Sequence, residues 1–172
     1  MRVEVEGKVI DESKSREAGD TTASTSERPL RDFDRSLPMS LMRAREVVMK
    51  EFLPALRDNN LTPQQWRVIR SLEQVDSQTL SELSQRCYLM MPSVSRIVQA
   101  LEARALITRA SVAGDQRSSV LSLTKTGKAL FEQVAPKSAE RYEYITEKFG
   151  YGKLELLYEL LDELVEKLDG PL

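Results

Sequence analysis

A short stretch after Pro92 combines small polar and basic side chains at helical spacing. Four apolar residues in it repeat at i, i+3, i+4 and i+7, which predicts an amphipathic helix that turns them inward: Val94, Ile97, Val98 and Leu101. Four polar residues are left at the start and on the outer face of this helix: Ser93, Ser95, Arg96 and Gln99. Hydroxyl and amide groups can bond to phosphates and base edges, and an arginine can bind guanine through two hydrogen bonds. The pattern predicts a reading helix for duplex DNA, with an ordinary solvated helix face as the alternative.

A charged turn lies beyond that helix. The runs 106–112 and 118–123 flank a loop with Gly114 and Arg117, and the natural interpretation is two strands joined by a tight turn. The segment 84–128 holds seven basic and two acidic residues, although the whole chain has a formal net charge of −2. DNA responds to the nearby surface and not to the total charge. We therefore expect the helix and the hairpin to grip DNA together.

Composition limits the other kinds of chemistry. The 172 residues include no histidine and one cysteine, which excludes histidine-based triads, an internal disulfide and most zinc sites. We expect no catalytic site, no metal and no cofactor, because a nucleotide-binding glycine loop and a paired-carboxylate constellation are also missing. No apolar run approaches the ~20 residues of a membrane helix, and no signal-peptide core opens the chain. These features predict a cytoplasmic protein that is not an enzyme and has no membrane partner.

The elements that position these residues are predicted to be mainly helical. A first helix spans about 37–59 on the basis of its apolar stripe. Thr62-Pro63-Gln64-Gln65 begins the next helix with a capping box. A second capping box, Thr79-Leu-Ser-Glu82, opens a short helix that precedes the one at Pro92.

The C-terminal part of the chain has a different character. From Thr124 we expect helices to about Leu168, kinked at Pro136 and interrupted at Gly150-Tyr-Gly152. Four leucines recur on one face of the last helix: Leu157, Leu161, Leu164 and Leu168. One small domain does not cover so many apolar positions, so a second subunit is the expected cover. Residues 129–172 contain ten acids and five bases, which would keep this end of the chain away from DNA.

Several of these motifs together resemble the MarR family of winged helix-turn-helix regulators. The resemblance covers about residues 37–169 and is carried by Gln64-Gln-Trp-Arg67, the helix at Pro92, Leu106-Ile-Thr-Arg109, Asp115-Gln-Arg117 and Leu123-Thr-Lys-Thr-Gly127. Five motifs are similar to the subgroup that regulates homoprotocatechuate (4-hydroxyphenylacetate) degradation: Arg43-Ala-Arg-Glu46, Asn60-Leu-Thr-Pro-Gln-Gln-Trp-Arg67, Arg86-Cys87, Pro92-Ser93 and Asp115-Gln-Arg117.

The resemblance implies a mainly α fold, in which a three-helix core and a two-stranded β-hairpin wing are flanked by N- and C-terminal dimerisation helices. Residues 1–36 are expected to form a disordered tail, because their apolar residues follow no period. Residues 37–172 would be the MarR-type domain, with the winged lobe at 61–124 and dimerisation helices at 37–60 and 125–172. The implied protein is a homodimer that places two reading helices on a pseudo-palindromic DNA operator. It would repress an aromatic-catabolism operon until a small phenolic or aromatic acid releases it.

Three more residues are candidates for contact with DNA, two of them because of this resemblance. Arg117 is similar to the wing-tip arginine that enters the minor groove, where narrow A·T tracts attract it. Asp115 is similar to the aspartate that braces this arginine, and a plain surface pair in a turn is the alternative. Lys125, at the start of the following helix, is a candidate phosphate contact from its position alone, with an incidental surface lysine as the favoured alternative.

Four residues are candidates for the effector site. Arg45 lies among apolar residues of the first helix, where a half-buried guanidinium would bind the carboxylate of a phenolic acid; an intersubunit salt bridge is the equal alternative. Trp66 offers a flat apolar wall with one N–H donor, although core packing is its default role. Arg43 and Arg67 are weaker candidates for the same carboxylate.

Two other functions remain open at this point. Cys87 could sense oxidants through its thiol, although an inert buried thiol suits its apolar helix face better. A winged-helix module that binds proteins without specific DNA binding is the other possibility. The basic segment with its arginine-bearing turn counts against that module.

Overall fold

The computed structural model describes residues 32–112 and 115–169, and side chains throughout these ranges except at 112 and 115–118. In chain order the elements are a 3-10 turn η1 (Phe33–Arg35), α1 (Leu37–Asp58), α2 (Pro63–Gln74), β1 (Gln78–Thr79), α3 (Leu80–Arg86), α4 (Met91–Ala103), β2 (Ile107–Val112), β3 (Asp115–Leu123), α5 (Lys125–Phe149) and α6 (Tyr151–Leu168). The part of the expected tail at 1–31 lies outside the described residues. The 3-10 turn shows that regular structure begins before residue 37.

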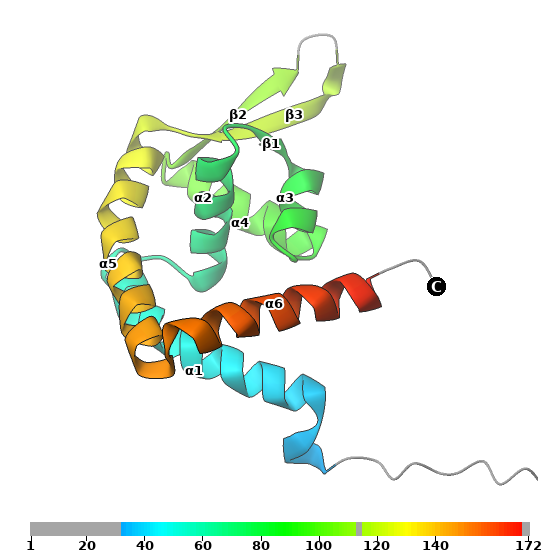
Figure 1. Cartoon of the computed structure of the whole chain (residues 1–172). Helices are drawn as coiled ribbons and strands as arrows, with labels where there is room; N and C mark the ends of the chain where they lie inside the picture. Colours follow the sequence, from blue (N-terminus) through cyan, green and yellow to red (C-terminus); the bar gives the residue numbers. More distant parts are fainter. Residues whose placement is uncertain (1–31, 113–114, 170–172) are drawn as a thin grey trace, which may run out of the picture.

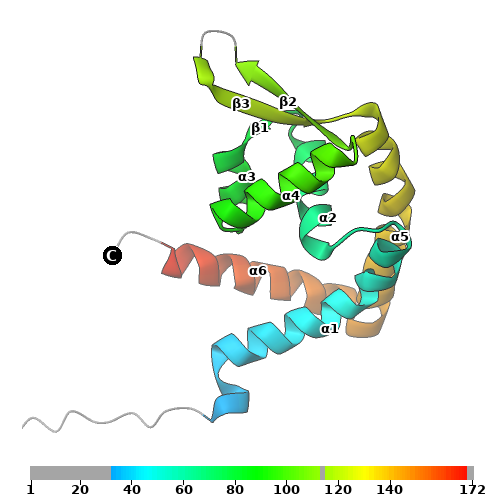
Figure 2. The same cartoon turned by 180° about the vertical axis from the view of Figure 1, so that it is seen from behind.

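Helices α2, α3 and α4 pack together beneath a small sheet and form a lobe (Figures 1 and 2). The predicted inward face of α4 is confirmed, because Val94, Val98 and Leu101 are completely buried and Ile97 packs against the same core. Apolar residues of α2, α3 and β3 complete this core: Val68, Ile69, Leu72, Leu83 and Leu121. Burial of the stripe turns the opposite face of α4 outward.

The sheet has three antiparallel strands in the order β1-β3-β2, one strand more than the expected hairpin. The additional strand β1 pairs with β3 through Gln78 opposite Leu121 and Thr79 opposite Val120. Gln78 is buried, where its side-chain amide donates to the Ser71 carbonyl at 2.9 Å and its oxygen accepts from the Ser71 hydroxyl at 3.1 Å. A two-residue strand held by one polar pair has no apolar alternation, so hydrophobic periodicity does not predict it.

Helices α1, α5 and α6 lie on the other side of α2 and make up a base (Figure 1). α1 packs against α5, and α6 folds back from the end of α5. Pro136 lies inside α5, which continues as one helix to Phe149. The break between α5 and α6 is narrower than expected: Gly150 alone interrupts the helices, at φ 97°, and Tyr151 already belongs to α6.

Side-chain caps fix where the helices begin. Both predicted capping boxes are present: the Thr62 hydroxyl accepts from the Gln65 amide at 3.1 Å, and the Thr79 amide donates to the Glu82 carboxylate at 2.7 Å. Hydrogen bonds from the Thr79 backbone and then its hydroxyl lower the pKa of Glu82. Thr124 caps α5 in the same way by accepting from the Gly127 amide at 3.0 Å. These bonds satisfy amides that a helix start leaves without partners.

Candidate DNA-binding surface and effector pocket

The outer face of α4 carries the polar residues that the sequence singles out. Arg96 and Gln99 are exposed, whereas Ser93 and Ser95, nearer the helix start, are partly buried. Figure 2 shows α4 crossing the lobe beneath the hairpin. One guanidinium and one amide on the free face of a helix have the geometry for contact with base edges in a major groove.

The hairpin of β2 and β3 extends away from the lobe (Figures 1 and 2). Its backbone ladder runs from Ile107 opposite Leu123 to Val112 opposite Asp115. The side chains of Asp115 and Arg117 lie outside the described ones, so their contacts stay predictions. Lys125 is exposed on the first residue of α5.

Arg109 on β2 connects the hairpin to α4, a role that the sequence did not indicate. Its Nε donates to the Glu102 carboxylate at 3.3 Å, and its Nη1 donates to the Ser119 hydroxyl on β3 at 3.2 Å. Because Glu102 belongs to α4, this side chain links the helix to both long strands. The alternation of β2 places Arg109 on an open face, but only the fold brings Glu102 beneath it.

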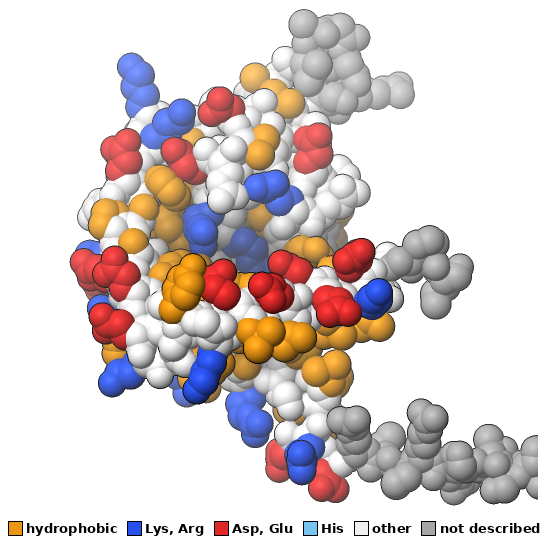
Figure 3. All heavy atoms as spheres, in the orientation of Figure 1, with side chains coloured by type: hydrophobic (Ala, Val, Ile, Leu, Met, Phe, Trp, Pro, Cys, Tyr) orange, Lys and Arg blue, Asp and Glu red, His pale blue; other side chains and the backbone are white. Residues whose placement is uncertain are grey.

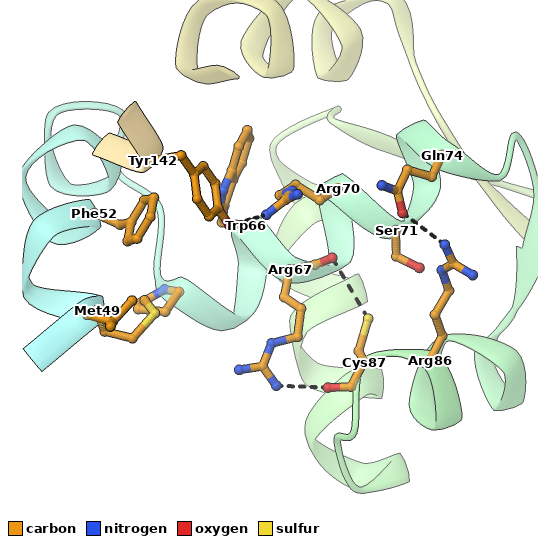
Figure 4. Close-up of a pocket in the computed structure, with 12 residues that line it drawn as sticks. Met49, Phe52, Trp66, Arg67, Arg70, Ser71, Gln74, Arg86, Cys87 and Tyr142 are labelled. Carbon is orange, nitrogen blue, oxygen red and sulfur yellow. Dashed lines mark hydrogen bonds between the residues drawn. The ribbon is translucent and has the colours of Figure 1, made fainter. Parts of the chain in front are cut away.

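A cavity of about 400 Å³ lies between the base and the lobe. α1, α2, α5 and the end of α3 line it with Val48, Met49, Phe52, Pro63, Trp66, Arg67, Arg70, Ser71, Gln74, Arg86, Cys87 and Tyr142 (Figure 4). Two of the four predicted effector residues, Trp66 and Arg67, are therefore brought together. Arg70, Arg86 and Tyr142 join them without having been predicted.

Aromatic side chains form one end of this cavity. Trp66 is buried and stacks on Phe131 with ring centroids 5.5 Å apart and planes 21° apart. Tyr142 packs against Phe52 at 5.1 Å, and Arg70 Nη1 donates to the Tyr142 hydroxyl at 3.4 Å. Trp66 thus packs in the core and also lines the cavity, and its contact with an effector stays a prediction.

Among the residues that the structure describes, three arginines and no acidic side chain line the cavity. Arg67 Nη1 donates to the Cys87 carbonyl at 2.8 Å, and Arg86 Nη2 donates to the Gln74 side-chain oxygen at 2.9 Å. Both acceptors are neutral, so the positive charges are not compensated within the lining. Guanidinium groups in this state favour an anion with carboxylate geometry.

The fold does not bring Arg43 or Arg45 to the cavity of this single chain. Both are exposed on α1, and Arg45 pairs with the neighbouring Glu46 at 2.6 Å, with 54% of its side chain accessible. Spacing along α1 indicated an apolar neighbourhood for Arg45. In the structure Arg45 has no such neighbourhood. α1 packs with Phe52 and Leu56 turned inward and leaves residues 41–48 exposed.

Comparison with known proteins shows which family has this sequence and fold. Residues 59–118 match the family model described as MarR family. The chain is 35% identical over 130 residues to the homoprotocatechuate degradative operon repressor of Escherichia coli, a match that spans 76% of this chain and 88% of the repressor. The chain belongs to the MarR family.

Other members of the MarR family agree with this placement. The HTH-type transcriptional regulator FarR of Neisseria gonorrhoeae is 36% identical over 142 residues, which are 83% of this chain and 97% of FarR. The crystal structure of NadR in complex with 4-hydroxyphenylacetate is 36% identical with a TM-score of 0.68, covering 79% of this chain and 96% of NadR. FarR and the E. coli repressor are transcriptional regulators and not enzymes. The winged helix-turn-helix fold and a role in DNA-binding transcription regulation follow for this MarR-family chain.

Cys87 of this MarR-family regulator has the surroundings of an inert thiol. The residue is 1% exposed, and its Sγ donates weakly to the Arg67 carbonyl at 3.8 Å. Burial raises the pKa of the Cys87 thiol above its ordinary value of 9.0, against a smaller lowering by a hydrogen bond from Ser71 and by Arg67 and Arg86. Oxidant-sensing thiols need the opposite shift and an accessible sulfur.

A broad apolar surface runs along the base of the MarR-family chain. Leu157 and Leu168 are exposed by 40% and 73%, while Leu161 and Leu164 are partly buried. α6 and α1 expose further large apolar side chains: Leu156, Leu160, Val165, Leu37, Leu41, Met42 and Val47. Figure 3 shows this apolar band between α6 and α1, with acidic side chains along α6 above it and basic side chains in the hollow above α6.

The described part of the chain holds neither a metal-binding cluster nor a membrane-spanning helix. Residues 32–112 and 115–169 contain no group of three metal-ligating side chains of the His, Cys, Asp or Glu type. In the same ranges no helix has the length and apolar character needed to cross a membrane.

Proposed function

We propose that this MarR-family regulator is a homodimeric repressor that occupies a pseudo-palindromic operator and leaves it when a small aromatic carboxylate binds. The regulated genes would form an aromatic-catabolism operon. The cavity lined by Trp66, Tyr142 and three arginines, without an acidic side chain, is the observation that carries the effector part of this proposal.

The DNA-binding part rests on α4 and the hairpin. α4 exposes Arg96 and Gln99 on a helix whose other face is fully buried, so the helix is rigid where it would meet DNA. Ser93 and Ser95 would bind phosphates near the helix start, Lys125 would bind a phosphate at the start of α5, and Arg117, braced by Asp115, would enter the minor groove.

The effector part rests on the position of the cavity. α2 contributes Trp66, Arg67 and Arg70 to it and is itself packed in the winged lobe, whereas Tyr142 belongs to the base. A bound aromatic acid would stack against the aromatic end and pair its carboxylate with a guanidinium. Because such a ligand touches both parts, it would favour one orientation of the lobe over another.

The homodimer part rests on the uncovered faces of α1 and α6. Leu157, Leu161, Leu164 and Leu168 would pack against the same helices of a second copy. A second subunit would also bring the α1 residues Arg43 and Arg45 beside other surfaces, so both stay in the proposal as effector or intersubunit contacts. The name of the E. coli repressor concerns homoprotocatechuate degradation, and NadR binds 4-hydroxyphenylacetate. These facts suggest phenolic acids as the first ligands to test.

The DNA part is tested by the affinity of the protein for the promoter of its own gene. Arg96→Ala should weaken specific binding by about 1–3 kcal/mol, because a guanine contact is lost. Arg57→Ala is the matched control. Arg57 is also exposed, but it lies at the end of α1 and does not belong to the predicted DNA face. Equal affinity of the wild-type protein for promoter and random DNA would refute specific recognition.

The effector part is tested by titration with 4-hydroxyphenylacetate. We expect a higher thermal midpoint and a lower affinity for the operator. The neutral 4-hydroxyphenylacetamide should do neither, because it lacks the carboxylate, and Arg70→Met should abolish the response to the acid. If neither 4-hydroxyphenylacetate nor 3,4-dihydroxyphenylacetate changes either quantity, this ligand class is wrong.

A further inference from the structure

The C-terminal end of α1 closes in a way that leaves two backbone carbonyls pointing out of the helix. The Leu61 amide donates to the Leu56 carbonyl at 2.9 Å and the Asn60 amide to the Arg57 carbonyl at 3.0 Å, with Asn60 in the left-handed region at φ 53°. This is the Schellman closure of a helix. The carbonyls of Asn59 and Asn60 take no part in it and need donors from elsewhere.

Arg104 supplies both donors. Its Nη1 donates to the Asn60 carbonyl at 2.8 Å and its Nη2 to the Asn59 carbonyl at 3.3 Å. Arg104 is the C-cap residue of α4, so one guanidinium joins the ends of α1 and α4 across 44 residues of sequence. The negative end of the α1 dipole favours a positive charge at this point, which strengthens the contact.

The end of α4 is also fixed to the start of α5. The Thr124 hydroxyl donates to the Ala105 carbonyl at 2.6 Å, and the Thr124 amide donates to the Leu106 carbonyl at 3.1 Å. A Cβ on Gly127 would lie 2.1 Å from the Leu106 carbonyl oxygen, so α5 passes directly against the chain that leaves α4. The ends of α1 and α4 and the start of α5 thus meet in one junction, in which Arg104 makes the bond to α1.

We infer that Arg104 is a positioning residue for DNA recognition, because it sets the direction in which α4 leaves the base of the dimer. This inference rests on the proposed function, in which α1 and α5 belong to the dimer base and α4 reads DNA. α1 packs on α5 and more lightly on α2. The Arg104 bonds therefore connect the reading helix to α1 without passing through the rest of the lobe.

A small change in the direction of α4 at Arg104 would displace the other end of the helix by several ångströms. α4 has 13 residues, and at ~1.5 Å per residue it is roughly 20 Å long. A tilt of about 10° around its C-terminal end would move its N-terminus by roughly 3 Å, close to the ~3.4 Å rise of one base pair. In a twofold dimer the two reading helices move in opposite senses, so a small change at Arg104 alters the half-site spacing that fits.

The test measures operator spacing and not affinity alone. Half-sites are first selected from random duplex DNA with the wild-type protein, and duplexes are then made with the two half-sites moved apart or together by one and two base pairs. The wild-type protein should prefer one spacing. Arg104→Met, which keeps the aliphatic stem and removes the donors, should reduce this preference by roughly tenfold, since bonds from a charged donor hold the helix. Arg104→Lys should give an intermediate spacing preference, because one ammonium group replaces a guanidinium that donates two hydrogen bonds.

Arg57→Met is the matched control, because it removes the same charge from the last turn of α1 without a bond to α4. A merely structural role of Arg104 would lower the active fraction equally for every spacing and leave the preference unchanged. An unchanged spacing preference in a folded, dimeric Arg104→Met protein would overturn this inference but not the proposed function. An equal loss of the spacing preference in Arg57→Met would do the same. Failure of the wild-type protein to select any half-site overturns the proposed function and the inference with it.

Discussion

Within residues 32–112 and 115–169, three residues other than glycine hold the left-handed backbone conformation, and each follows the C-cap of a helix. They are Asn60 at φ 53°, Tyr88 at φ 49° and Ala105 at φ 55°, after α1, α3 and α4. All three helices close with the same pair of backbone bonds, for example Leu106 to Leu101 at 3.0 Å and Ala105 to Glu102 at 2.8 Å after α4. Glycine is the usual residue at this position, because a Cβ makes the conformation costly.

Ala105→Gly should therefore stabilise the protein. A left-handed residue with a Cβ costs about 1–2 kcal/mol, which glycine would avoid. The greater freedom of glycine in the unfolded chain offsets roughly 0.5–1 kcal/mol of this stabilisation. We expect a net increase of about 0.5–1 kcal/mol in the free energy of unfolding, measured by urea denaturation. Ala100→Gly, at an exposed position inside α4, should lower it by about 1 kcal/mol. Destabilisation by both changes would show that the strain at Ala105 is negligible.

The thiol of Cys87 should react slowly in the folded protein. Burial raises its pKa above 9.0, so little thiolate forms at neutral pH. A disulfide reagent should label the native protein far more slowly than the urea-unfolded one at pH 7.5, and dilute hydroperoxide should leave operator binding unchanged. Rapid native labelling, or release of DNA by the peroxide, would restore oxidation sensing as the function.

The same pKa shift has a consequence for stability. Because the folded pKa lies above the unfolded one, the stabilisation from this group is fully present below about pH 9. It is lost as the pH rises through the folded pKa. Cys87→Ala should remove this part of the alkaline dependence, which denaturation curves between pH 7 and pH 10 would show.

At the scale of elements, the start of α5 depends on a close approach that the Thr124–Gly127 motif makes possible. Thr124 caps the helix through the Gly127 amide, and Gly127 passes against the Leu106 carbonyl where α4 leads into β2. Gly127 is buried and has no positive φ, so the requirement is space and not backbone freedom. The motif joins the wing to the base.

Gly127→Ala should consequently be strongly destabilising. Its Cβ would lie 2.1 Å from the backbone oxygen of Leu106, which already accepts from the Thr124 amide at 3.1 Å, and we expect a loss of about 2–3 kcal/mol in the free energy of unfolding. Gly152→Ala in α6 is the control, since nothing lies within 4 Å of its Cβ. That change should gain about 0.5 kcal/mol, because alanine is the better helix former. Equal thermal midpoints for the two variants would contradict the close packing.

At the scale of the whole molecule, charge and apolar surface are divided between two ends. The segment with α4 and the hairpin is basic, and residues 129–172 hold ten acids and five bases. The acidic end also carries the uncovered leucines of α6. This division would let the base associate with a second copy while the lobes face DNA.

Leu161→Glu should shift the protein toward monomer. A carboxylate in the leucine face of α6 would have to be buried without a partner, which disfavours association. Sedimentation of the purified protein should show the change, and affinity for a two-half-site operator should fall with it. Lys153→Glu also adds negative charge to α6 but at a polar, exposed position, and it should remain dimeric. A dimeric Leu161→Glu protein would place the interface elsewhere.

Much of the local structure could be predicted from the residues alone, for a physical reason. Capping boxes at Thr62 and Thr79 and the apolar stripe of α4 act over three or four residues, so they are visible in the sequence and hold in the fold. The strand β1 was missed because one buried glutamine, Gln78, and not an alternating pattern, holds it in place. Local signals therefore determine helices better than short paired strands.

The sequence by itself determined that the chain has an amphipathic helix with a polar outer face, an arginine close to the turn between two strands, and an acidic, leucine-rich end, because these depend on residue type and period. Only the tertiary structure decided which arginines share a cavity. It brings Arg67, Arg70 and Arg86 into the lining of one cavity with Tyr142 and leaves Arg45 on an open face. It also decided that Arg104 joins α1 to α4. The partners that lie on different helices are 16 to 75 residues apart in the chain, and the angles at which helices pack bring them together.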